Sequence, residues 1–227
     1  MFYSVQGEGR WIGCPAVFIR LQYCHLGCSW CDTRYTWDSK NIDEATLFSI
    51  DKLVELILEL IPNSVKQNTM PHIVITGGEP MLFQENIVLL IAKLKTSNFN
   101  FIEIETSGTI IPSLDMRNAI DWWNCSPKLS NSLLNKSERI VPEAIQTFCK
   151  MKNVDYKFVV RNSKDVDEME NDYCPLISKE KIWLMPEGLT SASQIKKLKE
   201  IMYVCLDRGY RITPRLHILL WGNEKGK

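Results

Sequence analysis

Residues 16–33 read AVFIRLQYCHLGCSWCDT, an apolar run followed at once by three cysteines. The run Ala16–Gln22 is rich in β-branched and aromatic residues, which is typical of a buried strand. Similar runs recur along the chain, and most are followed by a polar or glycine-rich segment. The sequence predicts strands over Ala16–Gln22, His72–Thr76, Phe101–Thr106, Asp121–Cys125, Tyr156–Arg161 and Ile182–Met185, with Tyr210–Thr213 as a candidate for a seventh.

Helical patterns fall between most of these strands. The first is expected between the N-cap Ser49 and the stop signal Pro62-Asn63. Its apolar face comprises Leu53, Val54, Ile57, Leu58 and Ile61. Further helices are expected over Gln84–Lys95, Pro142–Met151 and Ser193–Leu206. The stretch between Asp121 and Pro142 is more irregular and gives no firm helix assignment.

The alternation of strands and helices predicts an α/β fold with a parallel sheet, either open or curled toward a barrel. Six or seven strands are fewer than the eight of a complete barrel. We therefore expect a partial (β/α) barrel of about six parallel strands. No internal repeat or low-complexity linker interrupts the sequence, so residues 1–227 are expected to form a single domain.

Polar and glycine-rich segments follow the carboxyl ends of five predicted strands. They are Cys24–Thr33, Gly77–Pro80, Ser107-Gly108, Ser126–Lys128 and Pro186–Gly188. In α/β folds ligands bind at this edge of the sheet, so these segments are expected to line one active site on the C-terminal face.

Composition narrows the class of substrate and the location of the protein. Lys plus Arg number 27 and Asp plus Glu number 27, so the chain lacks the basic surplus typical of nucleic-acid binding. A small-molecule substrate is favoured over a nucleic acid. The sequence has no apolar run long enough to cross a bilayer, and Met1–Ser4 lack a charged signal-peptide start. We expect no membrane association and a cytoplasmic location.

The eight cysteines fall into two groups. Cys14, Cys125, Cys149, Cys174 and Cys205 are scattered and are interpreted as buried, small apolar side chains. Cys24-x3-Cys28-x2-Cys31 can hold three corners of a [4Fe–4S] cluster and leave the fourth iron open to a cosubstrate. A zinc site with His25 as a fourth ligand, an electron-transfer cluster that recruits Cys14, and accidental clustering are the alternatives.

The cysteine motif after the first strand, followed by Gly77-Gly78-Glu79-Pro80 after the second, resembles the radical S-adenosylmethionine (SAM) superfamily. This resemblance implies a radical SAM core. It also implies a [4Fe–4S] cluster on Cys24, Cys28 and Cys31, whose open iron binds and cleaves SAM.

Further segments resemble the 7-carboxy-7-deazaguanine synthase family. They are Phe2–Gly9, Phe18–Leu21, Trp30–Thr33, Ile104–Thr109, Ser126–Lys128 and Pro214–Gly222. The resemblance implies a ring contraction of 6-carboxy-5,6,7,8-tetrahydropterin to 7-carboxy-7-deazaguanine with loss of ammonia, which serves the biosynthesis of queuosine and other deazapurines. One departure is Tyr23, which stands where members commonly carry glycine.

The resemblance also implies roles for single residues. Arg20 is the expected partner of the substrate carboxylate, because a guanidinium matches that group in a bidentate way. Thr33 is the implied Mg²⁺ ligand. The other implied substrate contacts are Val5, Gln6, Gly7, Glu8, Thr76 and His217. The implied SAM contacts are Gly77, Gly78, Glu79, Glu105, Ser126, Pro127, Lys128, Met185, Pro186, Glu187 and Gly188.

Partners and other functions follow from the same resemblance. It implies a homodimer and an electron donor such as flavodoxin or ferredoxin. An activase of the same superfamily, which would place a glycyl radical on a partner protein, is the second enzymatic hypothesis. A zinc-stabilised interaction module is the non-enzymatic one.

Overall fold

A curved eight-stranded sheet forms the centre of the computed structural model, which describes residues 1–38, 40 and 45–227. The strands lie in the order of the sequence: β1 (Phe2–Val5), β2 (Pro15–Leu21), β3 (His72–Gly77), β4 (Ile102–Thr106), β5 (Trp122–Cys125), β6 (Val154–Val160), β7 (Ile182–Pro186) and β8 (Arg211–Ile212). β1 is antiparallel to β2, and every later pair is parallel.

The predicted partial barrel is confirmed, with more strands than expected. All six predicted strands form, with small differences at their ends, and the seventh is the short β8. β1 was not predicted, because four half-buried residues give too short a pattern to recognise. In the described part of the chain β1 and β8 are the two edges of an open sheet.

The predicted helices are also confirmed. Lys52 N donates to Ser49 Oγ at 3.3 Å, so Ser49 caps the first helix as expected. The helices are α1 (Ile50–Leu60), α2 (Asn63–Lys66), α3 (Gln84–Thr96), α4 (Leu114–Ala119), α5 (Lys136–Arg139), α6 (Pro142–Cys149), α7 (Ser163–Asp172), α8 (Ser191–Arg208) and α9 (Leu216–Trp221). The irregular stretch before Pro142 contains β5, the 3₁₀ turn η5 (Ser130–Ser132) and α5.

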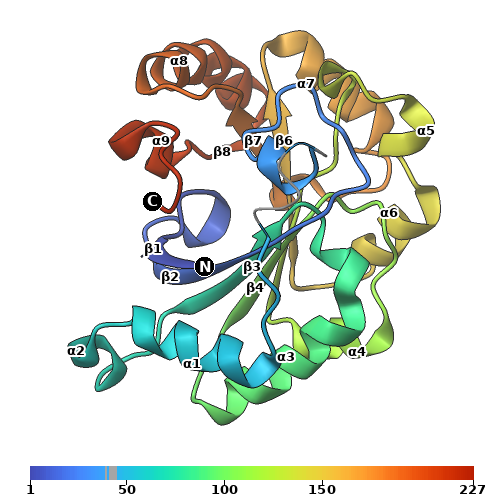
Figure 1. Ribbon diagram of the computed structural model, residues 1–227. Helices are drawn as coiled ribbons and strands as arrows, with labels where there is room; N and C mark the ends of the chain where they lie inside the picture. Colours follow the sequence, from blue (N-terminus) through green and yellow to red (C-terminus); the bar gives the residue numbers. More distant parts are fainter. Residues whose placement is uncertain (39, 41–44) are drawn as a thin grey trace.

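The outer face of the sheet is covered by helices (Figure 1). Alternate strand residues such as Ile73, Ile75, Ile102 and Ile104 are fully buried there in one large apolar core. Burial of this face supplies the main driving force for folding.

The inner face carries the other strand residues and is largely polar. Its carboxylate Glu103 is fully buried, accepts from Asn124 Nδ2 at 2.9 Å, and lies 3.0 Å from His72 Nδ1. The exposed Arg10 pairs through its Nε with the buried Asp155 at 2.7 Å. These contacts satisfy the buried carboxylates.

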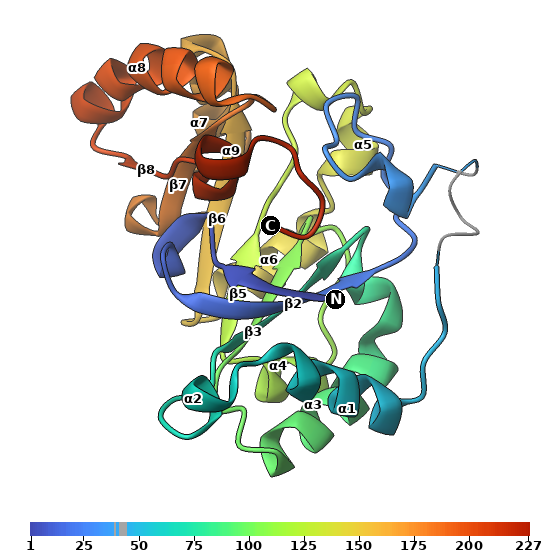
Figure 2. The same cartoon turned by 60° about the vertical axis from the view of Figure 1, so that its left-hand side comes forward.

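The two end segments of the chain meet beside β1 (Figure 2). Leu216 N, at the start of α9, donates to the Gly7 carbonyl at 2.9 Å. This contact brings residues far apart in sequence to one edge of the inner face. Within the described residues, no helix combines the length and apolar character needed to span a bilayer.

Candidate active site

A cavity of about 690 Å³, here called the central cavity, opens at the carboxyl ends of the strands. This size is in the range of small-molecule sites. The predicted site residues that line it are Val5, Gln6, Gly7, Glu8, Arg20, Cys24, Cys28, Cys31, Thr33, Thr76, Gly77, Gly78, Glu105, Ser126, Lys128, Met185, Pro186, Glu187, Gly188 and His217. Glu79 and Pro127 are the predicted site residues that do not line it.

The three clustered cysteines lie on a closed loop, residues 23–37, here called the cluster loop. Tyr23 N donates to the Thr36 carbonyl at 2.6 Å, and Gln22 Nε2 donates to the Tyr35 carbonyl at 2.8 Å, so the two ends of the loop are joined. Tyr23 has φ 74°. This left-handed conformation favours glycine, so the backbone at this position would suit the glycine that the resemblance leads us to expect here.

The Gly77-Gly78 pair packs against the start of the cluster loop. Gly78 N donates to the Leu21 carbonyl at 3.0 Å and Glu79 N to the Tyr23 carbonyl at 2.8 Å. A Cβ at Gly78 would overlap the Tyr23 carbonyl group. The pair therefore has a packing role against the start of the cluster loop.

The cysteine thiols sit beside hydrogen-bond donors. Trp37 Nε1 lies 3.3 Å from Cys31 Sγ, and Leu26 N lies 3.4 Å from Cys24 Sγ. Burial raises the pKa of the Cys24 thiol to about 11 and also raises the pKa of Cys28. A bound metal deprotonates its thiol ligands, and the donors then stabilise the thiolates. Three thiols on one cavity wall fit an iron–sulfur cluster.

The geometry disfavours the other metal sites. Within the described residues, no three His, Cys, Asp or Glu side chains converge on one ion position, as a zinc site requires. A cluster needs no such convergence, because each cysteine ligates its own iron. His25 is exposed and lies 2.8 Å from Thr109 Oγ1. Cys14 precedes β2, about 20 Å of strand away from the cluster loop.

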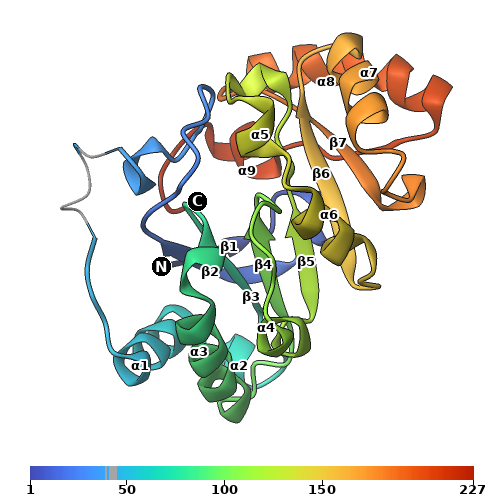
Figure 3. The same cartoon turned by 90° about the vertical axis from the view of Figure 1, so that its right-hand side faces the viewer.

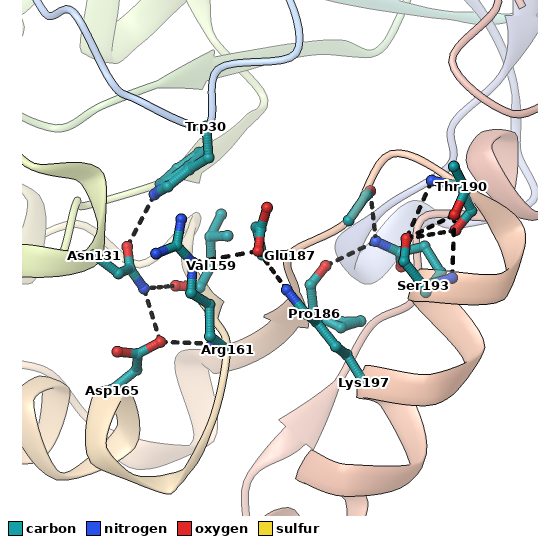
Figure 4. Close-up of polar contacts among 12 residues, drawn as sticks. Trp30, Asn131, Val159, Arg161, Asp165, Pro186, Glu187, Thr190, Ser193 and Lys197 are labelled. Atoms are coloured by element: carbon teal, nitrogen blue, oxygen red, sulfur yellow. Dashed lines mark hydrogen bonds and ion pairs between the residues drawn. The ribbon is translucent and has the colours of Figure 1, made fainter.

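The middle of the cluster loop docks on the segment before α5 (Figure 3). Ser29 N donates to the Ser132 carbonyl at 2.9 Å, and Trp30 Nε1 donates to Asn131 Oδ1 at 3.0 Å. Asn131 Nδ2 in turn donates to the Val159 carbonyl at 3.0 Å and to Asp165 at 2.9 Å (Figure 4). Asn131 thus connects the loop to β6 and α7.

Lys128, Ser126 and Glu105 line the cavity beside the cluster loop. Lys128 Nζ donates to Ser126 Oγ at 3.1 Å and lies 5.6 Å from the centre of the Trp30 ring. Glu105 accepts from Thr76 Oγ1 at 2.8 Å. These groups offer both charges to a zwitterionic ligand.

Glu79 lies beneath the cavity wall. Its carboxylate accepts from Thr106 Oγ1 at 2.7 Å, from Ser107 N at 2.8 Å, from Ser107 Oγ at 2.5 Å and from Met81 N at 3.1 Å. Glu79 is 1% exposed, so its carboxylate oxygens accept hydrogen bonds from the protein and not from solvent. The residue therefore fixes Thr106 and Ser107, which do line the cavity.

Side chains of α8 hold the turn after β7 in place. Gln194 Nε2 donates to the Pro186 and Gly188 carbonyls, each at 2.9 Å, and Glu187 pairs with Arg161 at 3.2 Å and with Lys197 (Figure 4). These bonds hold the Met185–Gly188 backbone at the cavity edge.

Arg20 has a buried Nε atom with no hydrogen-bond partner among the described residues. Arg20 is half-buried and lines the cavity, and no ion pair of Arg20 occurs among the described residues. A buried N–H without a hydrogen-bond partner is costly unless a ligand supplies one. The strand-end salt bridge that an arginine here would otherwise suggest is absent from the described residues, and the site fits a carboxylate ligand.

The Gln6–Glu8 segment contacts His217 at the cavity wall. A Cβ at Gly7 would overlap the His217 ring, so this contact requires glycine. Gln6 Nε2 lies 3.5 Å from Glu103 Oε2, and Glu8 N donates to Gln6 Oε1 at 3.2 Å. The segment is thereby held with its backbone toward the cavity.

Glu8 lies among three basic side chains. It pairs with Lys157, with Arg215 Nε at 3.0 Å, and lies 3.9 Å from His217 Nε2. Burial opposes its ionisation, but the positive charges of Lys157 and Arg215 outweigh burial, and the pKa of Glu8 is well below its ordinary value. Glu8 is therefore a fixed carboxylate. Burial lowers the pKa of His217, so its imidazole is held neutral.

Sequence reasoning missed Lys157, Arg215 and Asp32 as site residues. Arg215 pairs with both Glu8 and Asp32 and donates to the Gly188 carbonyl at 3.1 Å, so it joins three walls of the cavity. A signal was available for Lys157, which is a charged residue inside an apolar strand run. Arg215 lay inside a quoted motif, but its partners cannot be inferred from local sequence.

Thr33 lines the cavity near the cysteines. Its Oγ1 lies 3.6 Å from Cys31 Sγ, and its carbonyl accepts from Thr36 N at 2.9 Å. The hydroxyl oxygen is of the type that coordinates a hard cation. The predicted burial of the scattered cysteines is confirmed for Cys125 and Cys205, and it is wrong for Cys14, Cys149 and Cys174, which are half-buried. All eight cysteines are free thiols.

Comparison with known proteins agrees with this geometry. Residues 18–155 match the model of the Radical SAM superfamily. The crystal structure of QueE from Escherichia coli is similar over 96% of this chain and 92% of that one, with a TM-score of 0.68 and 28% identity. Streptococcus suis SuiB bound to S-adenosylmethionine shares the fold, at a TM-score of 0.55 and 11% identity over 88% of this chain and 46% of that one.

Three relatives that match over nearly their full length share the same name. The 7-carboxy-7-deazaguanine synthase of Pyrobaculum aerophilum is 33% identical over 100% of this chain and 95% of its own length. That of Halobacterium salinarum is 32% identical over 98% and 89%, and that of Escherichia coli is 30% identical over 96% and 94%. The chain therefore belongs to the radical SAM superfamily and, within it, to the 7-carboxy-7-deazaguanine synthases.

Proposed function

We propose that this chain converts 6-carboxy-5,6,7,8-tetrahydropterin to 7-carboxy-7-deazaguanine with release of ammonia, as a step in queuosine and deazapurine biosynthesis. The family membership supports this reaction. The structural observation that carries it is Arg20, whose buried Nε atom has no partner among the described residues and which lines the same cavity as the three clustered cysteines. A carboxylated substrate would supply the missing hydrogen-bond partner of Arg20 beside the cluster.

Cys24, Cys28 and Cys31 would hold a [4Fe–4S] cluster with one iron open to SAM. When bound, the reduced cluster and SAM supply a 5′-deoxyadenosyl radical that removes a hydrogen atom from substrate. The chain contributes orientation: the joined ends of the cluster loop and its dock on Asn131 keep the three thiols on one wall. Positioning of this kind is the main protein contribution to such chemistry.

The proposed SAM-binding residues lie at the carboxyl ends of four strands, β3, β4, β5 and β7. Lys128 and Glu105 offer opposite charges to the carboxylate and ammonium of the methionine part. The full proposed set is Gly77, Gly78, Glu79, Glu105, Ser126, Pro127, Lys128, Met185, Pro186, Glu187 and Gly188. Glu79 would act indirectly, through the Thr106 and Ser107 groups it holds.

The pterin would bind between Arg20 and the Glu8 group. Arg20 would take the carboxylate in a bidentate way. Glu8, fixed as a carboxylate, would accept N–H groups of the heterocycle, while the neutral His217 imidazole can donate or accept one hydrogen bond. Val5, Gln6, Gly7 and Thr76 would complete the contacts.

Thr33 would provide a hydroxyl ligand to Mg²⁺ near the substrate carboxylate. A hard cation accepts hydroxyl and carboxylate oxygens, and Thr33 lines the cavity together with Arg20. Its hydroxyl lies close to Cys31, so a cation there would be near the cluster loop.

We also propose that residues 1–227 work as one radical SAM domain in the cytoplasm. A homodimer and a flavodoxin or ferredoxin donor are the assembly and partner that the family suggests. The glycyl-radical activase is not favoured, because the near-full-length relatives are synthases. The zinc module is not favoured, because no suitable ion position exists in the described residues.

The test is turnover by anaerobically reconstituted protein given SAM, dithionite and 6-carboxytetrahydropterin. We expect 7-carboxy-7-deazaguanine from the wild type. We expect Cys28→Ala to abolish SAM cleavage, because two thiolates leave two irons exposed. Cys14→Ala is the matched control and should keep activity, since Cys14 lies at the far end of β2.

Each outcome of that assay has a separate meaning. A full complement of iron and sulfide without deazaguanine product would contradict the synthase function. Deoxyadenosine formation by Cys28→Ala would show that another cysteine serves as ligand.

A further inference from the structure

The indole of Trp37 lies across the cluster loop. Its Nε1 is 3.3 Å from Cys31 Sγ, and a Cβ at Gly27 would meet the far side of the ring at 3.8 Å. Trp37 also lines the central cavity. The ring therefore spans the loop from Gly27 to Cys31, with its only polar hydrogen directed at a proposed ligand sulfur.

The position of Trp37 is set by the turn that precedes it. In the 3₁₀ turn η2 (Arg34–Thr36), Thr36 N and Thr36 Oγ1 both donate to the Thr33 carbonyl, at 2.9 and 2.8 Å. Trp37 N donates to the Arg34 carbonyl at 3.0 Å, and the Thr36 carbonyl accepts from Tyr23 N. The indole is thus held by a hydrogen-bonded turn that also closes the cluster loop.

A hydrogen bond to a ligand sulfur changes the reduction potential of an iron–sulfur cluster. One-electron reduction adds negative charge to the cluster and its thiolates. A donor aimed at a sulfur stabilises the reduced form more than the oxidised form, so it raises the potential. Thr33 Oγ1, at 3.6 Å, is a weaker second neighbour of the same sulfur.

We infer that Trp37 is a positioning residue for the Cys31 sulfur and raises the reduction potential of the cluster through its indole N–H. This inference rests on the proposed function, since it needs the [4Fe–4S] cluster on Cys31. The physical effect is to make the cluster easier to reduce by one electron before SAM is cleaved.

The test is the potential of the cluster-loaded protein, titrated with redox dyes in the absence of SAM. Trp37→Phe keeps an aromatic ring against Gly27 and removes the N–H. At a fixed ambient potential, we expect the ratio of reduced to oxidised cluster to fall about tenfold, which is about 59 mV for one electron. Trp183→Phe is the matched control, because Trp183 does not line the central cavity and its indole N–H has no hydrogen-bond partner among the described residues. It should leave the ratio unchanged.

A second measurement uses the unmutated protein. Pulsed electron paramagnetic resonance of the reduced cluster, with tryptophan labelled by ¹⁵N in the indole, should detect a ¹⁵N coupling. The coupling should persist in Trp183→Phe and disappear in Trp37→Phe. This measurement stands even where Trp37→Phe fails to take up a cluster.

The outcomes separate this inference from the proposed function. A protein with no [4Fe–4S] signal at all would contradict the function. A normal cluster whose potential is equal in wild type and Trp37→Phe, or a wild type with no ¹⁵N coupling, would overturn the inference about Trp37 and leave the function standing.

Discussion

Lys157 and Phe158 are neighbours on β6, yet they face opposite sides of the sheet. Phe158 is fully buried against the helices, with its ring centre 5.1 Å from that of Tyr173. Lys157 points to the inner face, where it pairs with Glu8 at the cavity. The outer side chain contributes apolar burial, whereas the inner one contributes charge at a site.

The same division holds along β2 and β4. Ile19 and Ile104 belong to the apolar core, while Arg20 and Glu105 line the cavity. Strand alternation therefore assigns stability to one face and ligand binding to the other. Substitutions on the two faces should separate in the same way, with effects on unfolding on one side and effects on catalysis on the other.

The largest expected effect is on the inner face. Arg20→Leu removes the group proposed to pair with the substrate carboxylate, so kcat/KM for the carboxylated pterin should fall about 10³-fold, or about 4 kcal/mol. The free energy of unfolding should be little changed. Steady-state kinetics and denaturant unfolding measure the two quantities. The exposed Arg117 provides the control variant Arg117→Leu, which should match wild type. An Arg20→Leu enzyme with normal kcat/KM would remove Arg20 from the site.

The outer face should behave in the opposite way. Phe158→Ala leaves a cavity in the core and should lower the free energy of unfolding by roughly 3 to 4 kcal/mol. At low temperature, where the chain stays folded, kcat should be close to wild type. Denaturant titration and product assays on the same preparation check both. Lost activity with unchanged stability would show that the two faces are not independent.

Lys157→Met should have a smaller effect, on both the pKa of Glu8 and kcat/KM. The substitution keeps the length of the side chain and removes one of the positive charges beside Glu8, whose pKa should then rise. Arg215 still pairs with Glu8, so kcat/KM should fall about tenfold and not more. A nuclear magnetic resonance titration of the Glu8 carboxyl, together with kinetics, tests this. A Glu8 pKa unchanged by the variant would argue against Lys157 as its partner.

The smallest effect concerns pH. Burial lowers the pKa of His217 in the folded chain below its ordinary value of 6.5. Below about pH 6.5 the unfolded chain binds this proton more readily than the folded one, so stability should fall as the pH drops from 6.5 toward 5. His217→Asn should lose less stability over that interval, with the exposed His25→Asn as control. Identical pH profiles for wild type and His217→Asn would contradict the assignment.

Much of the fold could be predicted from sequence because the central strands are long apolar runs. β1 could not, since its four residues gain order only by pairing with β2. The sequence predicts β8 as a candidate strand over Tyr210–Thr213, and in the structure it has two residues, beside β7. The extent of such short edge strands depends on tertiary contacts that no local pattern records.

The site shows a similar limit. Cys24, Cys28 and Cys31 are found by spacing, because they are close in sequence. Arg215 and Asp32 form a pair across 183 positions of the chain, and only the fold joins them. Glu79 lies in a motif of the site, but its role under Thr106 and Ser107 depends on the neighbouring strand.

Three cysteines are proposed to leave one iron of a cluster open to SAM. Electron paramagnetic resonance of the reduced, anaerobically reconstituted protein tests it most directly, with and without SAM that carries ¹⁵N in its amino group. We expect a [4Fe–4S]⁺ signal that changes when SAM is added and then shows coupling to ¹⁵N. A cluster signal indifferent to SAM, or no cluster signal, would contradict it.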